Sequence, residues 1–180
     1  GSRSARAGVI WMQSANQEMK HSFRRLAATT AGLAFGLILL GVYTGAAGAG
    51  LACAGRWPLC DGWLGLFPAT WPSFIEWFHR FVAMIAGFFI LGVAGSAWRH
   101  DRSRWIRYSS TTALAVLPAQ VLLGANTIFN FGVMAQVLHH AAALLILTSL
   151  TVTTTLAFAD AKTAATTVSD TASSATPSDD

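Results

Sequence analysis

Long runs of apolar residues dominate the chain, and polar residues collect between them. Four runs are long enough to cross a bilayer, near Leu26–Ala47, Phe74–Ala97, Ser109–Phe129 and Val133–Phe158, because a hydrocarbon core of ~30 Å needs roughly 20 helical residues. They lack the strict alternation of apolar and polar positions that is typical of strands. Since every backbone polar group must be bonded within lipid, the runs predict helices. The pattern therefore predicts an all-α membrane protein, a bundle of four transmembrane helices.

Composition and charge agree with a multi-pass protein of the cell membrane. Apolar residues make up 53% of the 180 residues and charged residues only 11%, whereas soluble domains carry about 25% charged residues. Basic residues precede the first run and separate the second from the third, at Lys20, Arg24, Arg25, Arg99, Arg102, Arg104 and Arg107. Because such residues collect on the cytoplasmic side, we expect both termini inside, an N-in/C-in topology. No basic face of a soluble domain is visible, so we expect no nucleic-acid partner.

The segments outside the runs suggest how the chain is divided. We expect residues 1–21 to be a leader or tag without fixed structure and residues 22–160 to form the membrane domain. Residues 161–180 have few large apolar side chains, so we expect a disordered tail. A cleaved signal peptide is the alternative for the first run, but that run exceeds the usual core of about 7–15 residues. The loop 48–73 is unusually long and rich in aromatic residues, so we expect a lid over the outer mouth of the bundle.

Ionisable residues lie inside two of the predicted helices, where they are costly and indicate function. Glu76, His79 and Arg80 open the second run, and His139 and His140 lie early in the fourth. With both termini inside, these two helices run in the same direction. His79 and His139 each lie about six residues into their helix, roughly 9 Å deep at ~1.5 Å per residue. Two imidazoles at one depth favour axial ligation of a haem iron.

Two other interpretations of these histidines remain open. Each histidine can instead form a hydrogen bond with a neighbouring helix. Zinc is the other metal to consider. Glu76 and His79 are three residues apart and share one face of their helix, and His139 of the fourth helix could be the third ligand. A zinc site normally requires three or four such ligands in tetrahedral geometry, which makes it the weaker metal hypothesis.

The predicted lid contains both cysteines of the chain, Cys53 and Cys60. Outside the cytoplasm such a pair can persist as a disulfide, and Gly55 and Pro58 between them favour a turn that brings them together. Two unpaired thiols are the alternative, and a redox-active pair is a further one. The disulfide interpretation depends on the extracytoplasmic position of the loop.

A short internal repeat relates the two halves of the chain. Leu39-Leu40-Gly41 in the first helix matches Leu122-Leu123-Gly124 in the third, and each is followed by a loop and a histidine-bearing helix. The repeat predicts two parallel helical hairpins. Four glycines of the first helix, Gly32, Gly36, Gly41 and Gly45, are expected to serve close helix packing.

Four segments together resemble the haem A synthase family. They are Cys53-Ala-Gly-Arg-Trp-Pro-Leu-Cys60, Ile75-Glu-Trp-Phe-His-Arg80, Gln120-Val-Leu-Leu-Gly124 and the fourth helix with His139. The resemblance covers roughly residues 22–158. Larger members of that family duplicate a four-helix unit, so the chain resembles a half-size member.

The resemblance implies an oxidoreductase that converts the C8 methyl group of haem O into the formyl group of haem A, for cytochrome oxidase assembly. It implies that His79 and His139 are axial ligands of a haem b iron and that Glu76 is the catalytic carboxylate near the substrate methyl. It also implies an outer disulfide between Cys53 and Cys60.

The resemblance leaves several points open. Arg80 is expected to contact a haem propionate or to extend to the outer interface. His140 departs from the family pattern, and since neighbouring helical residues point ~100° apart only one of the pair can face the haem; we favour His139. One histidine pair offers one haem site where the larger members have two, so we expect a homo-oligomer. The expected protein partner is haem O synthase or cytochrome oxidase.

A second class of function remains as an alternative to the enzyme. The chain can be a b-type cytochrome, or a haem-binding membrane module, that performs no methyl oxidation. The simplest alternative is a four-helix scaffold without haem.

Overall fold

The computed structural model describes the backbone of residues 2–174 and the side chains of residues 8, 11–12 and 14–160. Its elements are four long helices and one short 3-10 helix: α1 (Ser2–Ala46), η1 (Trp63–Gly65), α2 (Trp71–Arg99), α3 (Arg104–Phe129) and α4 (Val133–Ser174). Within these described residues there is no strand. The prediction of an all-α fold is confirmed.

All four long helices contain a segment that is long and apolar enough to cross a membrane, namely Ser14–Ala46, Trp71–Arg99, Arg104–Phe129 and Val133–Asp160. Large apolar side chains such as Phe35, Phe88 and Leu122 lie exposed on the outside of the bundle. In water such a surface would be unfavourable, whereas lipid solvates it. The four predicted membrane spans are confirmed.

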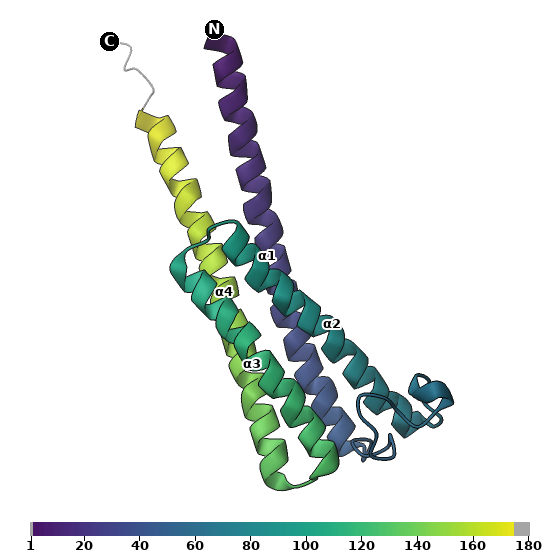
Figure 1. Cartoon of the computed structure of the whole chain (residues 1–180). Helices are drawn as coiled ribbons and strands as arrows, with labels where there is room; N and C mark the ends of the chain where they lie inside the picture. Colours follow the sequence, from purple (N-terminus) through teal and green to yellow (C-terminus); the bar gives the residue numbers. More distant parts are fainter. Residues whose placement is uncertain (1, 175–180) are drawn as a thin grey trace.

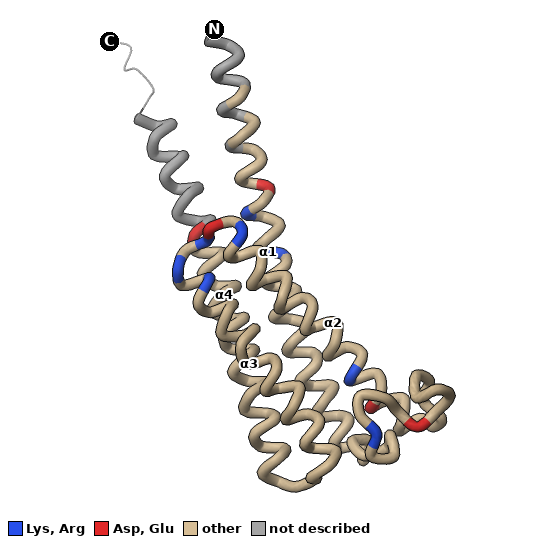
Figure 2. Tube along the Cα trace, in the orientation of Figure 1, with Lys and Arg blue, Asp and Glu red and all other residues tan. Residues whose placement is uncertain are grey.

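The helices form a four-membered ring in which each packs against two neighbours, and α2 and α4 lie on a diagonal (Figure 1). Both ends of the described chain lie at one end of the bundle. The loop between α1 and α2 lies at the other, together with the short connection between α3 and α4 (Figure 1). Lysine and arginine gather at the end with the termini (Figure 2). The direction of the bundle in the membrane stays a prediction.

Small side chains fill much of the space between the helices. Two buried clusters are formed by Phe23, Val93, Ala97, Ile106 and Ala157 and by Ala34, Ile90, Ala113, Ile146 and Leu150. The buried hydroxyl of Thr30 donates to the carbonyl of Leu26 over 2.7 Å, one turn back in the same helix. The buried hydroxyl groups of Thr44, Ser110 and Ser149 likewise donate to a carbonyl four residues back, so they are satisfied within an apolar environment.

The helix ends differ from the expected boundaries. We expected the first helix to begin near Leu26 and the fourth to end near Phe158, but α1 begins at Ser2 and α4 ends at Ser174. Residues 2–21 and 161–174 are therefore helical where we expected disorder. Neither segment contains proline, and the only glycine is Gly8, so no residue interrupts the helices that continue from the bundle. Residues 1 and 175–180 of the expected ends lie outside the described residues, and the division into domains stays a prediction.

Candidate functional site

The loop between α1 and α2, residues 47–70, folds back onto the start of α2, and we call it the lid. Cys53 and Cys60 form a disulfide within it, with their Cα atoms 4.5 Å apart. Leu64 and Gly65 adopt positive φ angles of 54° and 73° in the tight turn of η1. The lid is thus closed by a covalent link and a turn.

Ser73 attaches the lid to the first turn of α2. Its fully buried hydroxyl lies 2.7 Å from Asp61 Oδ2 and 3.0 Å from the carbonyl oxygen of Ala52, both in the lid. The hydrogen bond from Ser73 holds the pKa of Asp61 below its usual range. Thr70 caps the same turn, because its side chain accepts a hydrogen bond from the backbone N–H of Ser73 over 3.3 Å.

Arg80 makes a second connection between the lid and α2. Its Nη1 donates to the carbonyl oxygens of Arg56 and Leu59 in the lid, over 2.9 and 2.8 Å. Its Nε donates to Glu76 Oε1 over 2.9 Å, one helical turn away. The Glu76 side chain is only 8% exposed, and that of Arg80 14%. The pair is therefore nearly buried between the lid and α2.

These contacts bear on the two roles that we expected for Arg80. Its Nε and Nη1 are occupied within the protein, so the side chain does not simply extend to water. Its Nη2 is buried and has no hydrogen-bond partner in the part of the chain that the structure describes. A buried N–H without an acceptor is costly, so one donor of Arg80 remains for an anionic ligand.

Each expected haem ligand lies against a glycine of the preceding helix. A Cβ placed on Gly41 of α1 would lie 3.0 Å from Cε1 of His79 on α2. A Cβ placed on Gly124 of α3 would lie 3.1 Å from Cε1 of His139 on α4. The same contact thus occurs in both hairpins, at the same Leu-Leu-Gly sequence.

The two histidines lie on the diagonal pair of helices, His79 on α2 and His139 on α4. The Nδ1 atoms of His79 and His139 are both buried without a hydrogen-bond partner among the described residues. Gln120 of α3 approaches His139, with its Nε2 atom 3.4 Å from the ring Nε2. The alternative of a bond to a neighbouring helix therefore applies to His139 through its Nε2 atom, whereas the Nδ1 atoms of both rings remain without a partner among the described residues.

His140 has a different environment from His139. Its Nδ1–H donates to the carbonyl oxygen of Gln136 over 2.7 Å, and its ring is nearly perpendicular to that of His139, at 87°. A metal-bound histidine often donates its second nitrogen to a carbonyl, so this bond would also suit a ligand. The glycine contact that His139 shares with His79 still favours His139 as the equivalent residue.

The structure draws attention to residues that sequence reasoning did not assign. Aligning the two glycine–histidine contacts places Gln136, three residues before His139, opposite Glu76, three residues before His79. It also places His140 opposite Arg80. The first hairpin thus carries an ion pair where the second carries a neutral amide and an imidazole. The Leu-Leu-Gly repeat, extended into the following helices by aligning His79 with His139, could have revealed this correspondence from the sequence.

The described residues contain no group of three or more histidine, cysteine, aspartate or glutamate side chains arranged to hold a metal ion. Zinc ligation by Glu76, His79 and His139 therefore gains no support, because zinc needs at least three protein ligands. Two axial imidazoles are enough for a haem iron, whose other four ligands come from the porphyrin.

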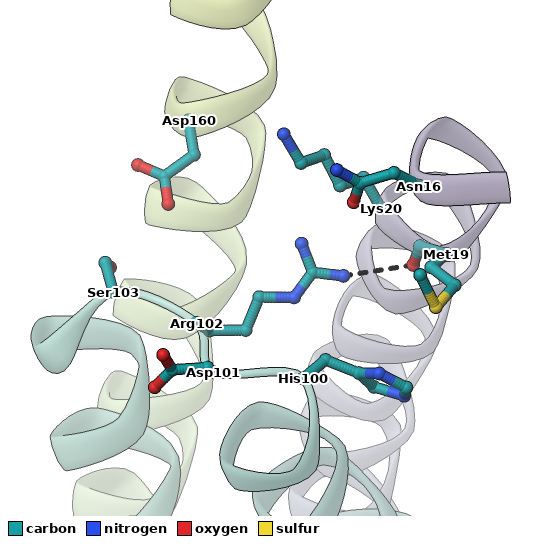
Figure 3. Close-up of a pocket in the computed structure, with 8 residues that line it drawn as sticks. All are labelled: Asn16, Met19, Lys20, His100, Asp101, Arg102, Ser103 and Asp160. Carbon is teal, nitrogen blue, oxygen red and sulfur yellow. Dashed lines mark hydrogen bonds between the residues drawn. The ribbon is translucent and has the colours of Figure 1, made fainter. Parts of the chain in front are cut away.

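A separate cavity of about 340 Å³ lies near the termini, at the end of the bundle opposite the lid. Figure 3 shows Lys20 and Asp160 around it, together with Arg102, which donates to the carbonyl oxygen of Met19 over 3.0 Å. Cations and carboxylates are mixed in its lining. The cavity lies at the end of the bundle opposite His79 and His139, so we do not assign it to the same site.

Comparison with known proteins adds the following. Residues 13–151 match COX15-CtaA, a family described as cytochrome oxidase assembly protein. A protoheme IX farnesyltransferase of Halobacterium salinarum is 39% identical over 108 residues, which cover 59% of this chain and 23% of that protein. A heme A synthase of Bacillus licheniformis is 35% identical over 119 residues, covering 64% and 39%. A heme A synthase of Symbiobacterium thermophilum is 35% identical over 106 residues, covering 57% and 33%. The matches thus span about a quarter to two fifths of the length of these relatives.

Proposed function

The chain belongs to the COX15-CtaA family of cytochrome oxidase assembly proteins, and from this premise we propose that it acts in haem A biosynthesis. The proposed reaction oxidises the C8 methyl group of haem O to the formyl group of haem A. Two relatives that carry the name heme A synthase support this assignment. The observation that carries it is a pair of half-buried histidines on diagonal helices, with a buried carboxylate one turn from one of them.

The residues present fit a haem b between α2 and α4. Both candidate ligands, His79 and His139, have a buried Nδ1 atom without a partner among the described residues, and the glycine that faces each ring makes room for the ring itself. A haem bound by two imidazoles supplies one-electron redox chemistry. The unpaired Nη2 of Arg80 is a suitable donor for a propionate, since charge-assisted bonds to carboxylates are among the strongest that arginine makes.

Glu76 is the proposed catalytic residue. Turning a methyl group into a formyl group with water as the oxygen source releases four electrons and four protons, so the proposal includes an external electron acceptor in the membrane. Arg80 holds Glu76 Oε1 in place over 2.9 Å. A carboxylate held in a buried position can accept a proton from the substrate side or stabilise positive charge that develops there.

A b-type cytochrome without methyl oxidation is the second candidate, because the histidine pair by itself provides only a haem site. To separate the two, the protein is purified from membranes that contain haem O, and the extracted haems are separated by chromatography. We expect haem A from the wild type, none from Glu76→Gln, and neither haem A nor the haem spectrum from His79→Ala. Glu18→Gln is the matched control, since Glu18 is the only other glutamate and lies exposed in α1. Haem B alone in the wild type would support the cytochrome, and full activity of Glu76→Gln would contradict the role of Glu76.

We also propose that the active form is a homo-oligomer. One histidine pair provides one site, whereas the reaction needs a redox haem and a substrate haem. Light scattering of the protein in detergent measures the mass of the active species. A monomer with full haem A formation would contradict this part of the proposal.

The proposed protein partner is an enzyme that produces haem O. A relative of this chain is named protoheme IX farnesyltransferase, and the matched segment covers only 23% of it. The farnesyl-bearing haem is the substrate proposed here, so direct transfer between two membrane proteins would keep an apolar haem out of water. Co-purification of a tagged chain with the farnesyltransferase tests this, with an unrelated four-helix membrane protein as the control.

A further inference from the structure

The two glycine–histidine contacts recur with nearly equal geometry in the two hairpins. At Gly41 the hypothetical Cβ lies 3.0 Å from Cε1 of His79 and 3.7 Å from each ring nitrogen. At Gly124 the corresponding distances to His139 are 3.1 Å to Cε1, 3.6 Å to Nδ1 and 3.9 Å to Nε2. In both cases the Cε1 atom of the imidazole points at the glycine of the neighbouring helix, and the two ring nitrogens lie on either side of Cε1.

Close packing of helices, which we expected for the glycines of the first helix, does not explain this contact. Cβ atoms added at Gly32, Gly36 and Gly45 would meet nothing within 4 Å. Of these four glycines only Gly41 is approached by a neighbouring element, and the approaching group is the histidine ring. Glycine within a helix is less stable than alanine by roughly 0.5–1 kcal/mol, so an absent methyl group at a contact of this kind needs a specific reason.

We propose that Gly41 and Gly124 are positioning residues that set the orientation of the imidazole planes of His79 and His139. This inference rests on the proposed haem ligation by these two histidines. A methyl group at either position would enter the space of the ring, and the ring would have to turn or move away. The direction of its nitrogens would then change, although the ligand itself would remain. Each helix pair therefore contributes both a ligand and the surface that orients it.

The test compares Gly41→Ala and Gly124→Ala with Gly36→Ala and Gly45→Ala. The controls add the same methyl group to the same helix as Gly41, but into open space. Each protein is purified with its haem, and the electron paramagnetic resonance spectrum of the ferric form is recorded, because its g values depend on the relative orientation of two axial imidazole planes. We expect shifted g values and a several-fold lower haem content for Gly41→Ala and Gly124→Ala, and wild-type values for both controls. Spectra of the two test variants that match the controls would overturn the proposal.

A second measurement works without haem and remains informative if a variant is unstable. Thermal unfolding of the haem-free protein is compared for Gly41→Ala in the wild-type and in the His79→Ala background. If the methyl group acts on the ring, its destabilising effect disappears when the ring is absent, so the two changes are non-additive. Equal destabilisation in both backgrounds would overturn the proposal, because the glycine would then serve another contact.

Failure of this inference can be distinguished from failure of the proposed function. A wild type that binds haem through His79 and His139, with shifted g values in Gly41→Ala but no haem A formation, would support the positioning role and contradict the oxidation. A wild type whose spectrum shows no ligation by two imidazoles would overturn the positioning role itself.

Discussion

Arg80→Ala removes the group that joins the lid to the carboxylate below it. In the structure Arg80 forms one bond to Glu76 at 2.9 Å. It also forms two short bonds to lid carbonyl oxygens, at 2.9 and 2.8 Å, and a longer third one at 3.4 Å that we leave out of the sum. Breaking a buried ion pair from one side costs about 3–5 kcal/mol, because the remaining charge stays buried and unpaired. Each lost bond to the lid adds about 1 kcal/mol. We therefore expect the free energy of unfolding to fall by roughly 5–7 kcal/mol.

The expected loss of unfolding free energy has two parts, the ion pair with Glu76 and the hydrogen bonds to the lid. A double-mutant cycle separates these two parts. In the Glu76→Gln background no carboxylate charge is left unpaired, so Arg80→Ala should cost only the bonds to the lid, about 2 kcal/mol. The expected coupling between the two positions is then roughly 3–5 kcal/mol. Arg80→Lys should behave more like Arg80→Ala than like the wild type, since an ammonium cannot bond the carboxylate and two carbonyl groups in the same fixed geometry.

The assay is reversible unfolding in mixed micelles, followed by circular dichroism, with limited proteolysis as a separate measure of lid opening. Arg25→Ala is the matched control, because Arg25 is exposed at the other end of the bundle. We expect faster cleavage in residues 47–70 for Arg80→Ala and unchanged cleavage for the control. The reasoning is refuted if Arg80→Ala destabilises the protein equally in the wild-type and Glu76→Gln backgrounds, since the ion pair would then contribute nothing specific.

Three further predictions concern the ligand, the lid and its side of the membrane. His139→Ala should abolish the haem absorption band in the purified protein while His140→Ala retains it, and the opposite result would reassign the ligand to His140. The hydrogen bond from Ser73 lowers the pKa of Asp61. The ionised carboxylate therefore stabilises the lid at pH values above the ordinary aspartate pKa of about 4. This stabilisation is lost as the pH falls below that value and through the lowered pKa of Asp61. Proteolysis of the lid, measured with an acid-active protease, should accelerate in that acidic range for the wild type and already at neutral pH for Ser73→Ala; identical pH profiles would contradict this role. Cys53→Ser frees one thiol in the lid, and a membrane-impermeant maleimide should label it in intact cells, whereas labelling only after lysis would reverse the predicted topology.

The sequence predicted the number, type and approximate position of the membrane helices because apolar content is read along the chain. The structure extends α1 and α4 beyond the ends expected from the sequence, where the composition is polar but no residue interrupts the helix. Candidate ligands could also be identified from the sequence, since a histidine such as His79 stands out in an apolar run. The repeat was recognised only at Leu-Leu-Gly, and the correspondence of Glu76 with Gln136, which follows from aligning His79 with His139, was missed.

Sequence by itself thus determined that four apolar helices carry three histidines and one carboxylate near the same end of a bundle. Only the tertiary structure decided that Gly41 faces His79, that Gly124 faces His139, and that Arg80 joins Glu76 to the lid. The physical reason is that hydropathy is a local property of each segment. The rotation of a helix about its own axis, which decides what each side chain touches, is set by packing against residues that are distant in the chain.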